Sequence, residues 1–180
     1  MRKELYQEVK IPEGIEANLD DTILTIKGPE GEIKREFKIG KLVMEKKDNK
    51  IIFGNKKATK TEKRLMNTLA AHVRNMIKGV QEKFEYKLKI CFSHFPMTVD
   101  VQEKEAIIKN FLGEKIPRKA RLVPEVEVKI DKQIIVVTSH NKELAGQVAA
   151  NFENVTKVGK RDRRVFQDGI FITSKCGVEI

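Results

Sequence analysis

Cationic side chains concentrate in one short stretch near the C-terminal end of the sequence. Residues 156–172 read TKVGKRDRRVFQDGIFI, and Asp162 is the one acid within the cationic run. The run places two lysines and three arginines within eight residues: Lys157, Lys160, Arg161, Arg163 and Arg164. A guanidinium group is planar and binds a phosphate through two parallel hydrogen bonds, so the arginines favour phosphate recognition. A solvated surface loop is the alternative interpretation.

A second basic stretch, KIPRKAR, has no acid between its first and last cation. Pro117 excludes a helix here, so the stretch is predicted to be a loop or an edge strand. Its cations either bind phosphates or protect a strand edge from aggregation. The sequence leaves both interpretations open for Lys115, Arg118, Lys119 and Arg121.

A third basic cluster precedes and opens a predicted helix. It consists of Lys56, Lys57, Lys60, Lys63 and Arg64. Cations are unfavourable at the positive N-terminal end of a helix dipole. A bound phosphate would relieve that conflict, whereas side chains that point outward into solvent would avoid it, and the sequence does not decide between the two.

Residues that could catalyse a reaction or bind a metal are sparse. Cys91 and His94 have a Cys-x-x-His spacing, but a zinc site needs a second well-spaced pair, and the remaining Cys176, His72 and His140 are scattered along the chain. Ser93 precedes His94 in sequence, which does not by itself create an activated nucleophile. We therefore expect no catalytic site, no metal and no cofactor.

The composition favours a globular protein with a polyanionic partner. Lys and Arg number 36 against 26 Asp and Glu, which gives a net charge of +10, and 40% of the residues are hydrophobic. That surplus of cations favours a polyanion, and the apolar content is sufficient for packed cores. No run of 18 apolar residues occurs, and two cysteines do not make a disulfide framework, so we expect no membrane association and a cytoplasmic protein with reduced thiols.

The chain contains the same pattern of elements twice. KKDNKIIFG and RLMNTLAAHVRNMIKGV in the first half correspond to VKIDKQIIVV and ELAGQVAANFENVTKVG in the second. Alternating apolar and polar residues predict short strands, and apolar residues at three- or four-residue spacing predict one helix for each copy. We therefore predict an α+β fold made of two tandem domains, 1–79 and 80–180, each a largely antiparallel sheet with one helix packed on one face.

The ends and faces of both helices follow from capping residues and apolar spacing. Thr61 and Asn141 are the predicted N-caps, and Gly79 and Gly159 are the predicted stops. Phe152 is predicted to lie in the core of the second copy, with the neighbouring Asn151 and Glu153 facing outward.

Four segments resemble one known family. HVRNMIKGV, SHFPMTVDV, NFLGEK and RRVFQDGIFI occur in the same order in the archaeal and eukaryotic branch of the sixth large-subunit ribosomal protein family. The resemblance runs from IPEGI near the start to FQDGIFI near the end, and the length resembles that of the archaeal members.

The resemblance implies a specific function, which the composition alone does not indicate. Members are structural, non-enzymatic components that bind large-subunit ribosomal RNA near the sarcin–ricin loop and support the region where translational GTPases dock. It also implies contact with neighbouring large-subunit proteins and the stalk base, and it makes the C-terminal domain the main RNA-binding part. The implied RNA contacts fall on Lys157, Lys160, Arg161, Arg163, Arg164 and Gln167. A freestanding RNA-binding module, acting in regulation or processing, is the alternative.

Overall fold

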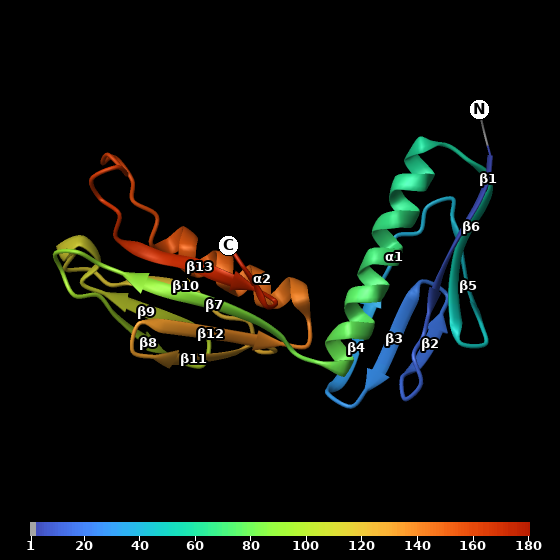
Figure 1. Ribbon diagram of the computed structural model, residues 1–180, viewed down its shortest axis with the longest axis horizontal. Helices are drawn as coiled ribbons and strands as arrows, with labels where there is room; N and C mark the ends of the chain where they lie inside the picture. The colour runs from blue at the N-terminus through green and yellow to red at the C-terminus, as the bar shows by residue number, and fades with distance from the viewer. Residues whose placement is uncertain (1–2) are drawn as a thin grey trace. The chain divides into compact units, whose positions relative to one another are not determined.

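The chain folds into two compact units, each with a hydrophobic core of its own. The computed structural model describes residues 3–180, and the units are Met1–Lys83 and Phe84–Ile180 (Figure 1). The division lies four residues beyond the boundary expected at Gly79, because the first helix continues past that glycine. No helix within residues 3–180 is long and apolar enough to cross a membrane.

The first unit combines two three-stranded antiparallel sheets with one helix. One sheet has the order β1-β6-β5 and the other has the order β2-β3-β4. The elements are β1 (Lys3–Lys10), β2 (Glu16–Asp20), β3 (Ile23–Gly28), β4 (Gly31–Glu36), β5 (Val43–Lys47), β6 (Lys50–Ala58) and α1 (Lys60–Gln81).

The second unit combines a five-stranded sheet, a three-stranded sheet and one helix. The sheet orders are β11-β12-β7-β13-β14 and β10-β9-β8, and every pairing is antiparallel. The elements are β7 (Phe84–Cys91), β8 (Thr98–Val101), β9 (Glu105–Lys109), the 3-10 turn η1 (Phe111–Gly113), β10 (Arg118–Arg121), β11 (Glu127–Asp131), β12 (Ile134–Ser139), α2 (Lys142–Val155), β13 (Gly169–Lys175) and β14 (Val178–Glu179).

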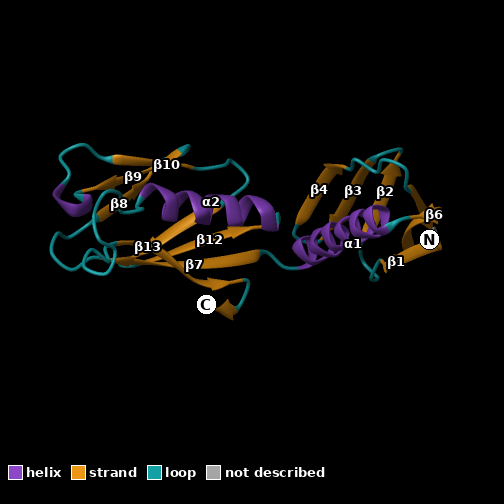
Figure 2. Cartoon of the chain, turned by 90° about the horizontal axis from the view of Figure 1, so that it is seen from above, coloured by secondary structure: helices purple, strands orange, loops and turns teal. Residues whose placement is uncertain are grey.

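The topology confirms the predicted α+β duplication. The sheet β1-β6-β5 corresponds to β7-β12-β11, and β2-β3-β4 corresponds to β8-β9-β10. In each unit the helix lies along one side of the strands (Figure 2). Each copy carries two sheets where the sequence predicted one. The second copy also adds β13 on the free side of β7, so the loop between α2 and β13 has no counterpart in the first copy.

Both predicted ends of the first helix were wrong by a few residues. The N-cap is Thr59 and not Thr61, because the Glu62 carboxylate accepts a hydrogen bond from the Thr59 backbone N–H at 2.9 Å and completes a capping box. Gly79 is buried inside the helix, which ends at Gln81. It continues because Val80 still packs in the core and its carbonyl accepts a hydrogen bond from the backbone N–H of Glu30 at 3.0 Å.

The second helix begins where the sequence predicted and ends earlier. The Asn141 side chain accepts a hydrogen bond from the backbone N–H of Glu143 at 3.0 Å, which confirms the N-cap. The helix ends at Val155, four residues before Gly159, because the Thr156 hydroxyl turns back to donate to the Phe152 carbonyl at 3.0 Å.

The core of the second unit confirms Phe152 and corrects its neighbours. Phe152 is fully buried, as is Val73, which the first helix places in its own core. Asn151 and Glu153 were predicted to face outward, but both connect the helix to strands. The Asn151 amide donates to the Arg121 carbonyl at 2.9 Å, and the Glu153 carboxylate accepts from the Ile172 backbone N–H at 2.9 Å.

Candidate nucleic-acid interface

The loop between α2 and β13 is fastened at both ends by hydrogen bonds to buried groups. At its start, the buried Thr156 hydroxyl accepts from the backbone N–H of Ile170 at 2.9 Å. At its end, Asp168 is 5% exposed and accepts from the Ser93 backbone N–H at 3.0 Å and from the Ser93 hydroxyl at 2.9 Å. The segment between, residues 157–167, is called the basic loop below. It projects from the rest of its unit (Figure 1).

The one acid of the basic loop shapes a turn within it. The Asp162 carbonyl accepts from the backbone N–H of Phe166 at 2.9 Å, and its carboxylate accepts from the backbone N–H of Arg164 at 2.9 Å. The Arg161 guanidinium lies over the Phe166 ring, 4.8 Å from the centroid, so it is partly ordered before any ligand arrives. Asp162 therefore helps to shape the loop that carries the cations.

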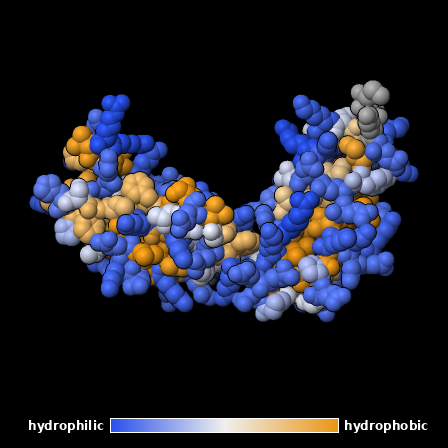
Figure 3. All heavy atoms as spheres, viewed as in Figure 1, coloured by the Kyte–Doolittle hydropathy of each residue, from blue (hydrophilic) through white to orange (hydrophobic). Residues whose placement is uncertain are grey.

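The cations of the basic loop are exposed. Lys157, Lys160, Arg161, Arg163 and Arg164 all belong to the exposed class, and so does Gln167, whose amide donates to the Arg164 carbonyl at 3.2 Å. The face drawn in Figure 3 shows strongly hydrophilic atoms at the tip of the projecting loop, beside a hydrophobic patch. Exposed cations on a loop anchored at both ends suit a polyanion, because the backbone that carries them is already positioned.

Arg118, from the second basic stretch, is brought to the same place but is engaged with the protein. Its guanidinium donates to the Val155 carbonyl at 2.6 Å and to both carboxylate oxygens of Glu114 at 2.8 and 2.6 Å. It also lies 4.3 Å from the Phe111 ring centroid, and its side chain is 28% exposed. A cation at the last carbonyls of a helix stabilises that end. Arg118 thus holds the end of α2 from which the basic loop departs.

The hydrogen bonds between Arg118 and Glu114 also change the acid's titration. They lower the pKa of Glu114 below its ordinary value of 4.5 by more than burial raises it, and the positive charges of Arg118 and Arg161 lower the pKa further. The carboxylate of Glu114 is therefore favoured in its charged form, which keeps Arg118 in place at neutral pH.

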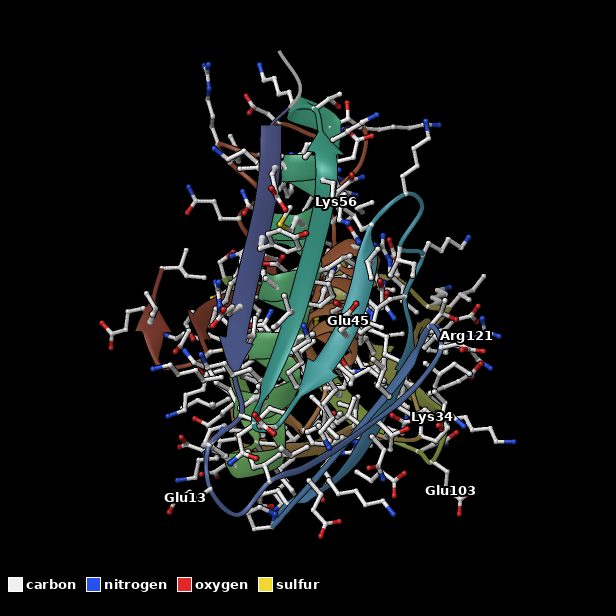
Figure 4. The ribbon with its side chains drawn as sticks, turned by 90° about the vertical axis from the view of Figure 1, so that its right-hand side faces the viewer. Glu13, Lys34, Glu45, Lys56, Glu103 and Arg121 are labelled. Carbon is white, nitrogen blue, oxygen red and sulfur yellow. The ribbon has the colours of Figure 1, made fainter. Side chains whose placement is uncertain are left out.

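The other members of the second stretch lie before and along β10. Strand β10 is an edge strand of its sheet, which was one of the two predicted alternatives. Lys119 forms an ion pair with Glu105 at 2.9 Å. The Lys119 side chain is 61% exposed and the Glu105 side chain is 43% exposed. Lys115 is exposed in the turn before the strand, and Arg121 is exposed at its end (Figure 4). Of these four cations, Arg118 contacts the start of the basic loop: its guanidinium donates a hydrogen bond to the Lys157 carbonyl at 3.4 Å.

The third basic cluster lies in the first unit. Lys56, labelled in Figure 4, and Lys57 are on β6, and the other three cations are exposed near the start of α1. The conflict with the helix dipole is reduced by Glu62, which stands in the first turn as the acidic partner of the cap. A bound phosphate is not needed to explain these cations.

The residues weighed for catalysis or metal binding do not assemble. Cys91 and Cys176 are free thiols, and within residues 3–180 no group of three or more His, Cys, Asp or Glu side chains could hold a metal ion. Ser93 is used to hold Asp168, and His94 is exposed in a turn.

A pocket beside the basic loop was missed by the sequence analysis. It has a volume of about 800 Å³ and lies between the loop, the end of β7 and the start of β13. Three phenylalanines contribute to its lining together with loop cations: Phe92, Phe166 and Phe171. The signal in the sequence was the two aromatic residues of FQDGIF, but their convergence with Phe92 depends on the pairing of β13 with β7.

Comparisons with known proteins agree with the duplicated fold. The model of a family described as Ribosomal protein L6 matches residues 11–83 and again residues 95–169. The chain is 42% identical to the “Large ribosomal subunit protein uL6” of Methanosarcina mazei over 176 residues, which is 98% of this chain and 100% of the relative. It is also 42% identical to the protein of that name from Methanobrevibacter smithii over 171 residues, 95% of this chain and 96% of the relative. The protein of that name from Methanocella arvoryzae is 42% identical over 177 residues, 98% of this chain and 100% of the relative.

Proposed function

The chain belongs to the ribosomal protein L6 family, and on this premise we propose that its basic loop binds large-subunit ribosomal RNA near the sarcin–ricin loop. Family membership establishes the coarser role. The protein is an archaeal-type, structural and non-enzymatic component of the large subunit of cytoplasmic ribosomes. The proposal adds which residues meet the RNA and where on the RNA they do so.

One observation carries the proposal. Five exposed cations lie on a loop whose two ends are fixed by Thr156 and Asp168. The one acid within that loop accepts a hydrogen bond from the loop backbone. A solvated loop needs no such anchorage, whereas an RNA-binding loop benefits from having its cations held at fixed positions. In protein–DNA complexes, about half to two-thirds of the hydrogen bonds go to phosphate and sugar oxygens, and these contacts fix the register of the complex.

The candidate residues then divide into two roles. Lys157, Lys160, Arg161, Arg163, Arg164 and Gln167 are proposed to contact the RNA. Arg118 is proposed to act through the position of α2, since its hydrogen bonds to Glu114 and Val155 occupy it. Lys115, Lys119 and Arg121 are proposed to extend the basic surface along β10, with the contribution of Lys119 reduced by its ion pair with Glu105.

The second unit is proposed to be the main RNA-binding part. The basic loop has no counterpart in the first copy, because it exists only where β13 is added to β7. The first unit and the remaining surface are proposed to meet neighbouring large-subunit proteins near the stalk base. On this proposal, translational GTPases come close to the protein only transiently, when they dock at the adjoining RNA.

Chemical footprinting on a large-subunit ribosomal RNA transcript tests the site of binding. The wild-type chain should protect nucleotides near the sarcin–ricin loop, and a variant with Lys160, Arg161, Arg163 and Arg164 all changed to Gln should lose that protection. A control variant with the exposed Lys34, Lys38 and Lys129 changed to Gln should keep it. Protection that lies elsewhere, or that survives in the loop variant, would overturn the proposal.

Sedimentation separates the ribosomal role from that of a freestanding RNA-binding module. A ribosomal component should migrate with large subunits in a gradient and stay with them after a moderate salt wash. A freestanding module would migrate mainly in the light fractions.

A further inference from the structure

The pocket beside the basic loop combines an aromatic lining with a cationic rim. Phe92 is 37% exposed and Phe171 is 46% exposed, so two large rings remain open to solvent within one concave site. Lys157, Arg163 and Gln167 contribute to the same pocket from the basic loop. Exposed aromatic rings beside hydrogen-bond donors and positive charge are typical of sites that bind unstacked nucleobases.

The pocket is held in shape by the same hydrogen bonds that hold the basic loop. Ser93 and Asp168 both line it and are hydrogen-bonded to each other, and Thr156 fastens its floor to the backbone of Ile170. A volume of about 800 Å³ lies within the range of ligand-binding pockets, and a single nucleotide fits within it. The site therefore exists without a ligand.

Gly169 lies close to the Phe171 ring. Its φ of +159° leaves the backbone extended, and a Cβ at this position would come within 3.1 Å of the Phe171 ring and within 3.4 Å of the Thr156 carbonyl oxygen. A side chain at 169 would therefore require the Phe171 ring to shift by a few tenths of an ångström. The absence of a side chain there leaves room for the Phe171 ring where it lines the pocket.

We propose that this pocket receives one unstacked base of the RNA strand whose phosphates contact the basic loop. The base stacks on Phe171 and Phe92, and the Gln167 amide and the Arg163 guanidinium reach its edge or its sugar. Positive charge at the rim favours a polyanion, and the rings favour an aromatic ligand. A single-stranded or bulged RNA segment has both a polyanionic backbone and unstacked aromatic bases. This inference rests on the proposed function, because it assigns to the same RNA a second kind of contact.

Photocrosslinking to a large-subunit ribosomal RNA transcript tests the proposal directly. Ultraviolet irradiation of the complex, followed by mass spectrometry, should give an RNA adduct on the peptide that contains Phe171 or on the one that contains Phe92. Phe171→Leu keeps an apolar side chain at an exposed position, so the fold should be retained, and circular dichroism checks this. The variant should lose its adduct and bind RNA about five-fold or more weakly, which is the lower end of the effect of one base stacked on an aromatic ring.

The salt dependence of binding separates this inference from the proposed function. Phe171→Leu should lower the affinity without changing the slope of log K against log salt concentration, because no phosphate contact is lost. Tyr6→Leu, which removes an exposed ring from the first unit, is the matched control and should bind as the wild type does.

Wild-type affinity of both Phe171→Leu and Phe92→Leu, with the loop arginines still required, would overturn the base pocket and leave the proposed function standing. An adduct with a neighbouring ribosomal protein in place of RNA in intact subunits would also overturn it. Loss of all dependence on the loop arginines would instead count against the proposed function.

Discussion

Asp168 and Ser93 are joined by two hydrogen bonds, although 75 residues separate them in the sequence. One carboxylate oxygen accepts from both the backbone N–H and the hydroxyl of Ser93, at 3.0 and 2.9 Å. The pair connects the end of the basic loop to the end of β7. The end of the basic loop is therefore attached next to β7, the central strand of the five-stranded sheet.

Asp168→Ala should destabilise the second unit and loosen the basic loop. Hydrogen bonds to a charged group contribute about 1.5–3 kcal/mol, and the change leaves the Ser93 donors without their acceptor. The free energy of unfolding, measured by urea denaturation, should fall by about that amount, and amide exchange within residues 157–167 should become faster. Asp100→Ala, which removes an exposed carboxylate paired with Lys109, is the control. Equal effects of the two changes would show that the loop is held by other contacts.

The second unit should fold without the first. It has its own core, and a fragment of its size buries enough surface for marginal stability. We expect residues 84–180 to be soluble, to unfold cooperatively and to retain most of the RNA affinity. A fragment that begins at residue 80 should be less soluble, because Val80 is fully buried in the core of the first unit and would be exposed. Circular dichroism and amide exchange that show an unfolded 84–180 fragment would contradict this expectation.

Phe152→Ala should be among the most damaging single changes in the second unit. The side chain is fully buried in the last turn of α2, and removal of a buried phenylalanine costs about 3–5 kcal/mol. The midpoint of chemical denaturation should fall accordingly, while RNA footprints of the protein that remains folded should be unchanged. Leu144→Ala, at a half-buried position of the same helix, should have a smaller effect. A negligible shift for Phe152→Ala would mean that the core of this unit is packed differently.

Acid should weaken the contact that holds the end of α2. The pKa of Glu114 is lowered in the folded protein from its ordinary value of 4.5, mainly by the hydrogen bonds from Arg118. The contact therefore stabilises the fold fully above about pH 4.5, and its contribution is lost as the pH falls through the lower folded pKa. Because the Glu114 side chain is 41% exposed, the contribution should be about 1 kcal/mol or less.

Denaturation of the wild type and of Glu114→Gln across this pH range checks the direction of the effect. The variant should be less stable near neutral pH, and the difference between the two proteins should shrink as the solution is acidified. A difference that grows on acidification would have the wrong sign for this account.

The sequence was sufficient for several features that depend on neighbouring residues. Apolar spacing identified Phe152 as a core residue, Asn141 was recognised as an N-cap because its partner is two residues away, and the cationic run was visible as a run. Thr59 was missed in favour of Thr61, although the pair Thr59 and Glu62 has the spacing of a capping box. That signal was local and could have been used.

The features that the sequence did not reveal depend on contacts between distant segments. Arg118 was counted with other cations, and only its approach to the end of α2, 37 residues away, shows that it positions the loop. Glu153 looked like a surface acid, but β13 brings the backbone of Ile172 to its carboxylate. The aromatic pocket likewise depends on the pairing of β7 with β13, which no short pattern specifies.

The salt dependence of RNA binding tests the central claim most directly. Each phosphate that a cation neutralises releases condensed counterions, so each arginine lost should lower the magnitude of the slope of log K against log salt concentration by about 1. The variant with Lys160, Arg161, Arg163 and Arg164 changed to Gln should lower it by about 3 to 4, while the Lys34, Lys38 and Lys129 variant should keep the wild-type slope. An unchanged slope in the loop variant would contradict the assignment of the basic loop to ribosomal RNA phosphates.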